Sequence, residues 1–238
     1  MNIAIIGNGK MGKEVERAAG VRGITVKKIF TLEDPIHAAG LADVDVCIDF
    51  SWPQSVIRNI EIAAENRKNI VIGTTGWYDR IDHVKKVVTE NRSGLLYSSN
   101  FSIGMNVFFK IAGEAAKSFD AYEMYDAAIA EIHHTAKKDS PSGTALALGE
   151  ILLKHLRRKT SLMMETSHGE IAPDQLHITS TRTGIVVGKH TVMFDSDADT
   201  IELIHTAKNR SGFALGALLA AEWLNGKQGL FTMEDIFR

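Results

Sequence analysis

Cysteine is nearly absent from this chain of 238 residues: Cys47 is the only one, so no disulfide can form within the chain. Neither sign of charge dominates, because 27 lysine and arginine residues stand against 29 acidic residues, for a formal net charge of −2. The basic residues are scattered, which argues against a nucleic-acid partner. No apolar run reaches the length of a membrane span, and the N-terminus has a strand pattern instead of a signal peptide. These absences predict a cytoplasmic protein that binds neither membranes nor nucleic acids.

The chain does contain enough apolar residues, 45% of the total, to build real cores, and its length suits one large or two modest domains. Cys47 lies within residues 44–50, a run that has the pattern of a buried strand. We interpret this cysteine as a small core hydrophobe and not as a nucleophile.

The first residues of the chain carry a nucleotide-binding signature. An uninterrupted apolar strand leads into a glycine-rich turn, and a helical pattern follows through Ala19. In such a turn the first glycine permits the tight bend, the second lets the backbone approach a pyrophosphate, and the third lets the helix pack close to the strand. A plain strand-to-helix turn is the alternative. The predicted nucleotide-binding residues of this turn are Gly7, Asn8, Gly9, Lys10, Met11 and Gly12.

Strands and helices continue to alternate after this turn. Strand patterns at 24–30, 44–50, 69–73 and 94–98 are interspersed with helical patterns at 53–66 and 78–91. This order predicts an α/β fold with a Rossmann-like, doubly wound parallel sheet, whose ligands lie beyond the carboxyl ends of the strands. Polar loops start at the carboxyl ends of three of these strands, although ordinary capping and turn chemistry would also explain them. The first loop is residues 49–51. The other two are predicted to bind the nucleotide, through Gly73, Thr74 and Thr75 and through Ser98, Ser99, Asn100 and Phe101.

The preference between NAD and NADP is left open by the sequence. An acid that binds the adenine ribose is expected about 20 residues beyond the glycine turn, near the end of the second strand. Glu33 and Asp34 come slightly late for that position, and Glu33 would favour NAD. Lys27 or Lys28 would instead neutralise the 2′-phosphate of NADP.

The segment from Glu131 to Thr144 concentrates reactive side chains: two histidines, two lysines and two carboxylates, followed by Ser-Pro-Ser-Gly-Thr. A histidine passes protons near neutral pH, and a lysine supplies fixed positive charge. We predict that Ser140 caps a helix with Pro141 at its first position, which leaves the next three amides available to an anion. Together these parts predict a pocket for a small carboxylate substrate that must be protonated.

The adjacent histidines His133 and His134 end a segment, starting at Ala128, that alternates like a strand. Their side chains should therefore point to opposite faces, and only one of them is expected to carry out proton chemistry. The other would bind substrate only if the strand ends at that point. We predict no metal site, because adjacent histidines lack a third ligand at helical spacing.

Beyond this segment, strand patterns at 161–167, 175–182, 190–195 and 200–207 follow one another without intervening helices. They predict a smaller α+β domain with an open antiparallel or mixed sheet, and hence an oligomer that buries the uncovered face. A last helix over 212–225 is expected to pack back on the first domain. The predicted domains are 1–102 with 212–238 for the dinucleotide, and 103–211 for substrate binding and oligomerisation.

With these residues in view, the chain resembles the 4-hydroxy-tetrahydrodipicolinate reductase family, also called dihydrodipicolinate reductase, of the diaminopimelate route to lysine. Residues 131–145 are similar to that family's His-His-x-x-Lys-x-Asp-Ala-Pro-Ser-Gly-Thr-Ala motif, with Ser140 in place of the usual alanine. The likeness covers nearly the whole chain. It includes residues 49–53, 72–76 and 99–106, Arg182 with residues 188–191, and residues 210–223.

The resemblance implies roles for individual residues. His133 matches the family's proton donor, Lys137 its second catalytic residue, and His134 a substrate contact. Gly143 and Thr144 match the pair that binds a substrate carboxylate. The resemblance also implies reduction of a cyclic dicarboxylate by NADH or NADPH, with hydride from one domain and the proton from the other, in a homotetramer built through the second domain's sheet.

Two other classes of protein stay open from the residues alone. Another NAD(P)-dependent dehydrogenase of similar layout, such as a semialdehyde dehydrogenase, would need a cysteine nucleophile on a loop, and Cys47 is a poor candidate. A non-enzymatic redox sensor that binds NADH and then DNA would need a basic recognition element, which the sequence does not show.

Overall fold

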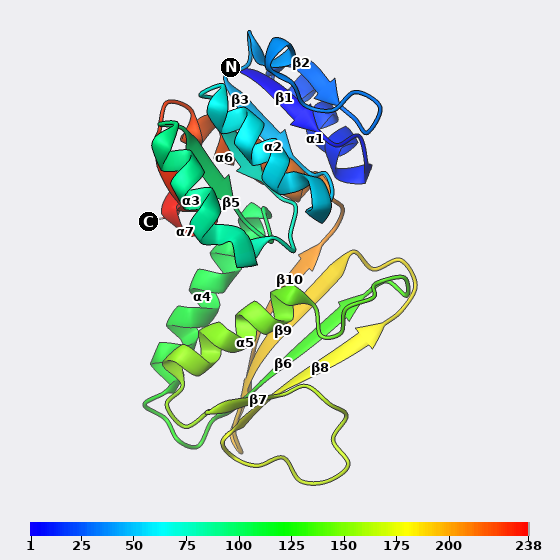
Figure 1. The fold of residues 1–238 in the computed structure, drawn as a ribbon. Helices are drawn as coiled ribbons and strands as arrows, with labels where there is room; N and C mark the ends of the chain where they lie inside the picture. Colours follow the sequence, from blue (N-terminus) through cyan, green and yellow to red (C-terminus); the bar gives the residue numbers. More distant parts are fainter. Residues whose placement is uncertain (238) are drawn as a thin grey trace. The chain divides into compact units, whose positions relative to one another are not determined.

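The computed structural model describes residues 1–237 and divides the chain into two compact units, whose elements are labelled in Figure 1. The first unit comprises Met1–Ile103 together with the chain from Arg210 onward, and the second comprises Gly104–Asn209. Within the described residues, no helix combines the length and the apolar character that crossing a membrane requires.

The first unit is built on a six-stranded sheet in which all neighbouring strands are parallel. Its strands are β1 (Asn2–Ile6), β2 (Thr25–Phe30), β3 (Val46–Asp49), β4 (Asn69–Ile72), β5 (Gly94–Tyr97) and β11 (Gly229–Thr232). The order β11-β5-β4-β3-β1-β2 places the first strand between the second and the third. This order confirms the predicted Rossmann-like winding.

Helices cover both faces of this sheet, as Figure 1 shows. They are α1 (Lys10–Val21), α2 (Pro53–Glu65), α3 (Ile81–Glu90), α6 (Ser211–Leu224) and the short α7 (Met233–Ile236), with 3-10 turns η1 (Ala38–Leu41) and η2 (Tyr78–Arg80). Alternate strand residues point to opposite faces, so Ile3 and Ile5 pack with α1 and α6, whereas Ala4 and Ile6 pack with α2 and α3. The last long helix therefore returns to the first unit's core, as predicted.

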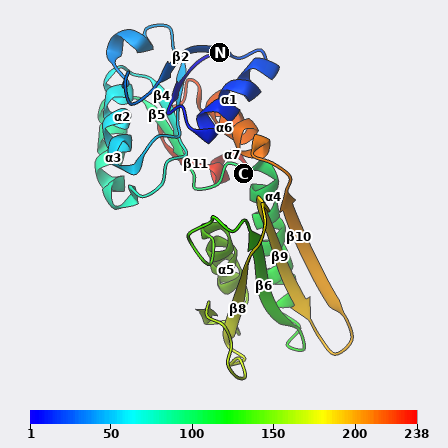
Figure 2. The same ribbon diagram turned by 90° about the vertical axis from the view of Figure 1, so that its right-hand side faces the viewer.

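The second unit contains a five-stranded mixed sheet and two helices. The strands are β6 (Asp126–His133), β7 (Ser161–Met163), β8 (Gln175–Arg182), β9 (Gly188–Asp195) and β10 (Thr200–Ala207), and the helices are α4 (Ile103–Phe119) and α5 (Gly143–His155). The central strand β6 runs parallel to β8 and antiparallel to β9. The hairpin of β9 and β10 forms one edge of this sheet (Figure 2). The predicted mixed sheet is confirmed.

Both helices of the second unit pack on one face of its sheet. Their apolar side chains share a core with Ile129, Ile178 and Val192, which lie side by side on three neighbouring strands. The intervening residues of β6, such as Ala128 and Ala130, point to the other face and are only half-buried.

Some element predictions need correction. The strand expected over 161–167 ends at Met163, and the chain then forms a loop that contains Gly169 and Pro173. The helical pattern from residue 78 begins as the turn η2, and α3 starts only at Ile81. Strand β11 and helix α7 were not predicted at all, because segments of four residues carry too little periodicity to stand out.

Candidate active site

A cavity of about 570 Å³ lies at the carboxyl ends of β1, β2 and β3, and Gly7, Asn8 and Gly9 line it. Gly7 has a φ of +101°, and a Cβ there would lie 2.5 Å from the carbonyl oxygen of Phe50, so this turn requires glycine. Gly12 does not line the cavity. A Cβ at Gly12 would lie 1.9 Å from the carbonyl oxygen of Gly7, and its role in the structure is the close packing of α1 on the turn.

A second cavity of about 410 Å³ adjoins the first. Lys10 and Met11 line it from the start of α1, and Gly73, Thr74 and Thr75 line it from the loop after β4. The residues that line both cavities are Gly9, Phe50 and Ser51. The two cavities thus follow the carboxyl ends of the parallel strands, where open α/β sheets bind their ligands.

Asp49, the last residue of β3, is fully buried and ties these loops together. Its Oδ1 accepts hydrogen bonds from the Thr74 hydroxyl at 2.7 Å and from the amide and hydroxyl of Ser51 at 2.9 and 2.8 Å. Its Oδ2 accepts one from Asn59 at 2.8 Å. Burial raises the pKa of Asp49, while these donors act in the opposite direction. The Thr74 hydroxyl therefore donates its hydrogen bond within the protein.

The loop after β5 is arranged differently from the other two. The Ser98 hydroxyl donates to the carbonyl of Asn100 and accepts its amide, which closes a turn. Phe101 is 2% exposed and belongs to the core of the first unit, where Gly216 of α6 approaches its carbonyl. Neither cavity is lined by these residues or by Ser99. Their contact with a cofactor stays a prediction.

An acidic side chain lines the first cavity. Glu33 accepts a hydrogen bond from the Thr31 hydroxyl at 2.8 Å, and this bond lowers the pKa of Glu33. Lys28 pairs with Asp34 at 2.6 Å instead. Of the described residues that line this cavity, none is a lysine or an arginine.

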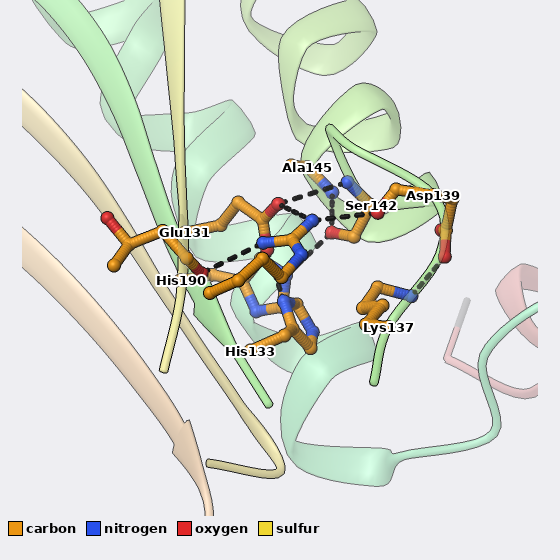
Figure 3. A network of polar contacts seen from close by, with 9 residues as sticks. Glu131, His133, Lys137, Asp139, Ser142, Ala145 and His190 are labelled. Atoms are coloured by element: carbon orange, nitrogen blue, oxygen red, sulfur yellow. Dashed lines mark hydrogen bonds and ion pairs between the residues drawn. The ribbon is translucent and has the colours of Figure 1, made fainter. Parts of the chain in front are cut away.

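In the second unit, β6 presents Glu131 and His133 on one buried face, because residues two apart on a strand share a face. His133 is the last residue of the strand, is 7% exposed, and hydrogen bonds through Nδ1 to the Glu131 carboxylate (Figure 3). Burial lowers the pKa of His133. The charges of Lys137 and Arg182 lower it further, whereas Glu131 raises it.

His134 follows the end of the strand and is half-buried. We expected the second histidine to bind substrate only if the strand ended at this point, and β6 does end at His133. The carbonyl of His134 accepts the amide of Lys137 at 3.1 Å in a turn. The Lys137 Nζ then pairs with Asp139 at 2.8 Å.

The start of α5 differs from the prediction. Ser142 is the N-cap, and its hydroxyl accepts the amide of Ala145 at 3.2 Å. The assignment of Ser140 as cap and Pro141 as first helical residue is wrong, because the Ser142 amide donates to Glu131 at 3.2 Å and so fixes the cap two residues later. This amide, which we expected to be available to an anion, is bonded within the protein.

The amide at the next position does meet an anion. Partial burial would raise the pKa of Asp139, but a hydrogen bond from Lys137 and another from the Gly143 amide hold it below its ordinary value. Gly143 is exposed, and Thr144 is half-buried beside it in the first turn of α5. The Asp139 carboxylate is therefore held between Lys137 and the start of α5, which shows that this corner favours a negative charge.

Two residues that sequence reasoning did not assign to the site complete it: Arg182, which is half-buried, and His190, which is buried. Arg182, the last residue of β8, donates to Glu131 at 2.8 Å and to the carbonyl of Asp139 at 2.7 Å. His190, on β9, meets His133 edge-on, with ring centroids 5.1 Å apart, and burial lowers the pKa of His190 to about 4. Strand register was the missing signal, since Glu131 pairs with His190 and His133 with Arg182.

The ligand atoms of Glu131, His133 and His190 lie within 4.8 Å of one another, a spacing that would suit a metal ion. The Glu131 carboxylate is already bonded to the Arg182 guanidinium, and Lys137 adds a second cation nearby. We therefore interpret the cluster as a hydrogen-bonded network and assign it no metal.

Comparisons with known proteins cover nearly the whole chain. Residues 1–101 match the family described as dihydrodipicolinate reductase, N-terminus, and residues 104–237 match its C-terminus counterpart. Proteins named 4-hydroxy-tetrahydrodipicolinate reductase are 40% identical in Christiangramia forsetii, over 99% of this chain and 97% of that one, and 37% identical in Archaeoglobus fulgidus, over 99% of both. A dipicolinate-bound dihydrodipicolinate reductase from Paenisporosarcina sp. TG-14 shares the fold, with a TM-score of 0.79 at 22% identity over 99% of each chain. The chain therefore belongs to the dihydrodipicolinate reductase family.

Proposed function

We propose that the protein is a cytoplasmic, NAD(P)H-dependent 4-hydroxy-tetrahydrodipicolinate reductase of lysine biosynthesis. The observation that carries the proposal is the corner where Lys137 and the Gly143 amide at the start of α5 hold the carboxylate of Asp139, close to the buried imidazole of His133. A cyclic dicarboxylate that takes up a proton needs both features, and membership of the family names this substrate.

Each unit would supply one part of the reaction. Residues 1–102 and 212–238 would hold the dinucleotide through the glycine turn and the loops after β4 and β5. Residues 103–211 would hold the substrate. We assign proton delivery to His133 with Lys137, and substrate contacts to His134, Gly143 and Thr144.

The reaction replaces a ring hydroxyl by hydrogen, so one hydride and one proton are taken up and the hydroxyl leaves as water. A bound dihydronicotinamide would supply the hydride. In the unliganded protein the lowered pKa of His133 favours the neutral imidazole. The substrate's two carboxylates would offset the charges of Lys137 and Arg182 and raise that pKa. Substrate binding would thereby bring the proton onto its donor.

A semialdehyde dehydrogenase, the main competing enzyme, needs a thiol nucleophile. Cys47 is the only cysteine, lies in β3 and is fully buried, and burial raises its pKa to about 12. A thiol in this state does not supply a thiolate. A redox sensor, the competing binding protein, would have no use for a buried proton donor beside a carboxylate site.

We propose NADH as the preferred cofactor. An acid at the position of Glu33, which lines the cavity beside the glycine turn, would accept hydrogen bonds from the adenine ribose and repel the 2′-phosphate of NADPH. Lys28, a cation that would neutralise this phosphate, is paired with Asp34. A lower KM for NADH than for NADPH is expected, and Glu33→Ser should narrow the difference. A preference for NADPH would contradict this assignment.

We also propose a homotetramer assembled through the uncovered face of the mixed sheet. Register places Ala130, Thr191 and Ile204 side by side on that face, opposite to α4 and α5. Ile204 is 49% exposed in the single chain. Thr191 is already buried, and a second copy packed on this face would remove Ala130 and Ile204 from water.

The reductase proposal is tested by mixing the purified protein with NADH or NADPH and the condensation product of pyruvate and aspartate semialdehyde. Nicotinamide absorbance should fall only when this product is present. In His133→Gln, kcat should fall by about 10²–10⁴-fold, the usual contribution of a positioned general acid, while nucleotide affinity stays the same. A folded preparation that oxidises neither cofactor would show that the assignment is wrong.

A further inference from the structure

The imidazole of His133 is held by residues of the mixed sheet, and Figure 3 shows it beside Glu131 and His190. Its Nδ1 bonds to Glu131, and the ring of His190 meets it edge-on. On β9, a Cβ added at Gly188 would lie 3.0 Å from Nε2 of His133. The ring therefore has one orientation, with Nδ1 turned toward the protein.

Glu131 is itself fixed in place. Its side chain has no exposed surface, and its Oε1 accepts hydrogen bonds from Arg182 at 2.8 Å and from the Ser142 amide at 3.2 Å. Burial would raise the pKa of Glu131, but the hydrogen bonds from Arg182 and His133 hold it below its ordinary value. Glu131 is thus a carboxylate, which can only accept hydrogen bonds.

We infer that Glu131 is the positioning residue of the proposed reaction: by accepting the Nδ1–H of His133, it makes Nε2 the nitrogen that delivers the proton. A carboxylate behind an imidazole fixes its tautomer and stabilises the imidazolium. The inference rests on the proposed role of His133, but the state of the ring can be measured without any turnover.

The charges around His133 give Glu131 a second effect. Lys137, from the loop after β6, and Arg182, from β8, are cations that disfavour the imidazolium. His190, from β9, is neutral at physiological pH because burial lowers its pKa to about 4. Among the described groups that face the ring, Glu131 is the one that favours protonation. Its charge therefore sets the pH up to which His133 remains protonated.

Glu131→Gln keeps the size of the side chain and removes this charge. The new side-chain amide would place its oxygen toward Arg182 and Ser142 and its N–H₂ group toward Nδ1 of His133. If the ring were protonated, two hydrogen-bond donors would then face each other. We expect kcat near neutral pH to fall by about 10²-fold, as for loss of a positioned acid. The alkaline limb of the kcat/KM profile should move to lower pH, while the KM for NADH stays the same.

Asp120→Asn is the matched control. Asp120 lies in the same unit, where it accepts hydrogen bonds from the amide and guanidinium of Arg157 at 2.7 and 2.6 Å, and it is not among the groups that face His133. This variant should lose stability without moving the pH profile. If Glu131→Gln lowers kcat equally at every pH, Glu131 only supports the fold, and the inference is overturned.

A ¹⁵N-histidine NMR spectrum of the wild-type protein tests the inference even if Glu131→Gln does not fold. Neutral His133, assigned by the signal that His133→Gln lacks, should carry its proton on Nδ1. A proton on Nε2 would overturn the inference, whether or not the protein reduces the substrate. An Nδ1–H ring in a protein without reductase activity would support the placement of Glu131 and refute the proposed function.

Discussion

Removing the hydroxyl of Ser142 should loosen the corner on which the proposed substrate site depends. This hydroxyl accepts the Ala145 amide at 3.2 Å and contacts His190 Nε2 at 3.3 Å, and Ser142 is 2% exposed. A helix cap is worth about 1 kcal/mol, and a buried polar partner left unsatisfied costs about 1–3 kcal/mol. Ser142→Ala should therefore lower the free energy of unfolding by about 2–4 kcal/mol.

Ser140→Ala is the matched control, because Ser140 is exposed and lies outside α5. It should change the free energy of unfolding by less than about 0.5 kcal/mol. Urea titrations followed by circular dichroism compare the two variants through their midpoints at equal m-values. Because the start of α5 is proposed to hold a substrate carboxylate, kcat/KM should fall in Ser142→Ala and stay the same in Ser140→Ala. Equal destabilisation by the two changes, or a larger effect of Ser140→Ala, would refute Ser142 as the cap.

Three further outcomes are expected. Lys137→Met should lower kcat/KM by about ten- to a hundredfold, because a hydrogen bond to a charged group is worth about 1.5–3 kcal/mol, and unchanged kinetics would remove its role. The folded-state pKa of His190 is lowered from 6.5 to about 4, so the unfolded chain binds the extra proton and stability is lost as pH falls through this window. Unfolding titrations should show a loss of up to about 3 kcal/mol that is absent in His190→Phe, and an equal loss in the variant would contradict this origin. Ile204→Glu on the uncovered sheet face should dissociate the proposed tetramer in light scattering, whereas an unchanged mass would place the interface elsewhere.

The regular elements were predictable wherever hydrophobic periodicity was strong. The strands expected over 175–182 and 200–207 are β8 and β10 with the same bounds, and the helix expected from residue 53 is α2. The loop after Met163 was not predictable, because the run over 161–167 looks like one strand in sequence, yet only Ser161–Met163 pairs with a neighbouring strand. The local sequence sets how readily a segment forms a strand, but pairing with a neighbouring strand decides whether it does.

The site was predictable only in part, for a related physical reason. His133, Lys137 and Gly143 lie close together in the chain, so their grouping could be read from spacing. Arg182 and His190 reach the site through strand register, and register depends on packing between distant segments. The cap of α5 was misplaced because a tertiary hydrogen bond from Ser142 to Glu131 decides it.

The most direct test of the central claim follows the hydride itself. The protein is incubated with NADH that carries deuterium at the transferred position of the nicotinamide, together with the condensation product of pyruvate and aspartate semialdehyde. The reduced dicarboxylate should be heavier by one deuterium, as read by mass spectrometry, and His133→Gln should form it far more slowly. A reduced product without deuterium, or labelled NADH that stays unconsumed beside the intact substrate, would contradict hydride transfer by this protein.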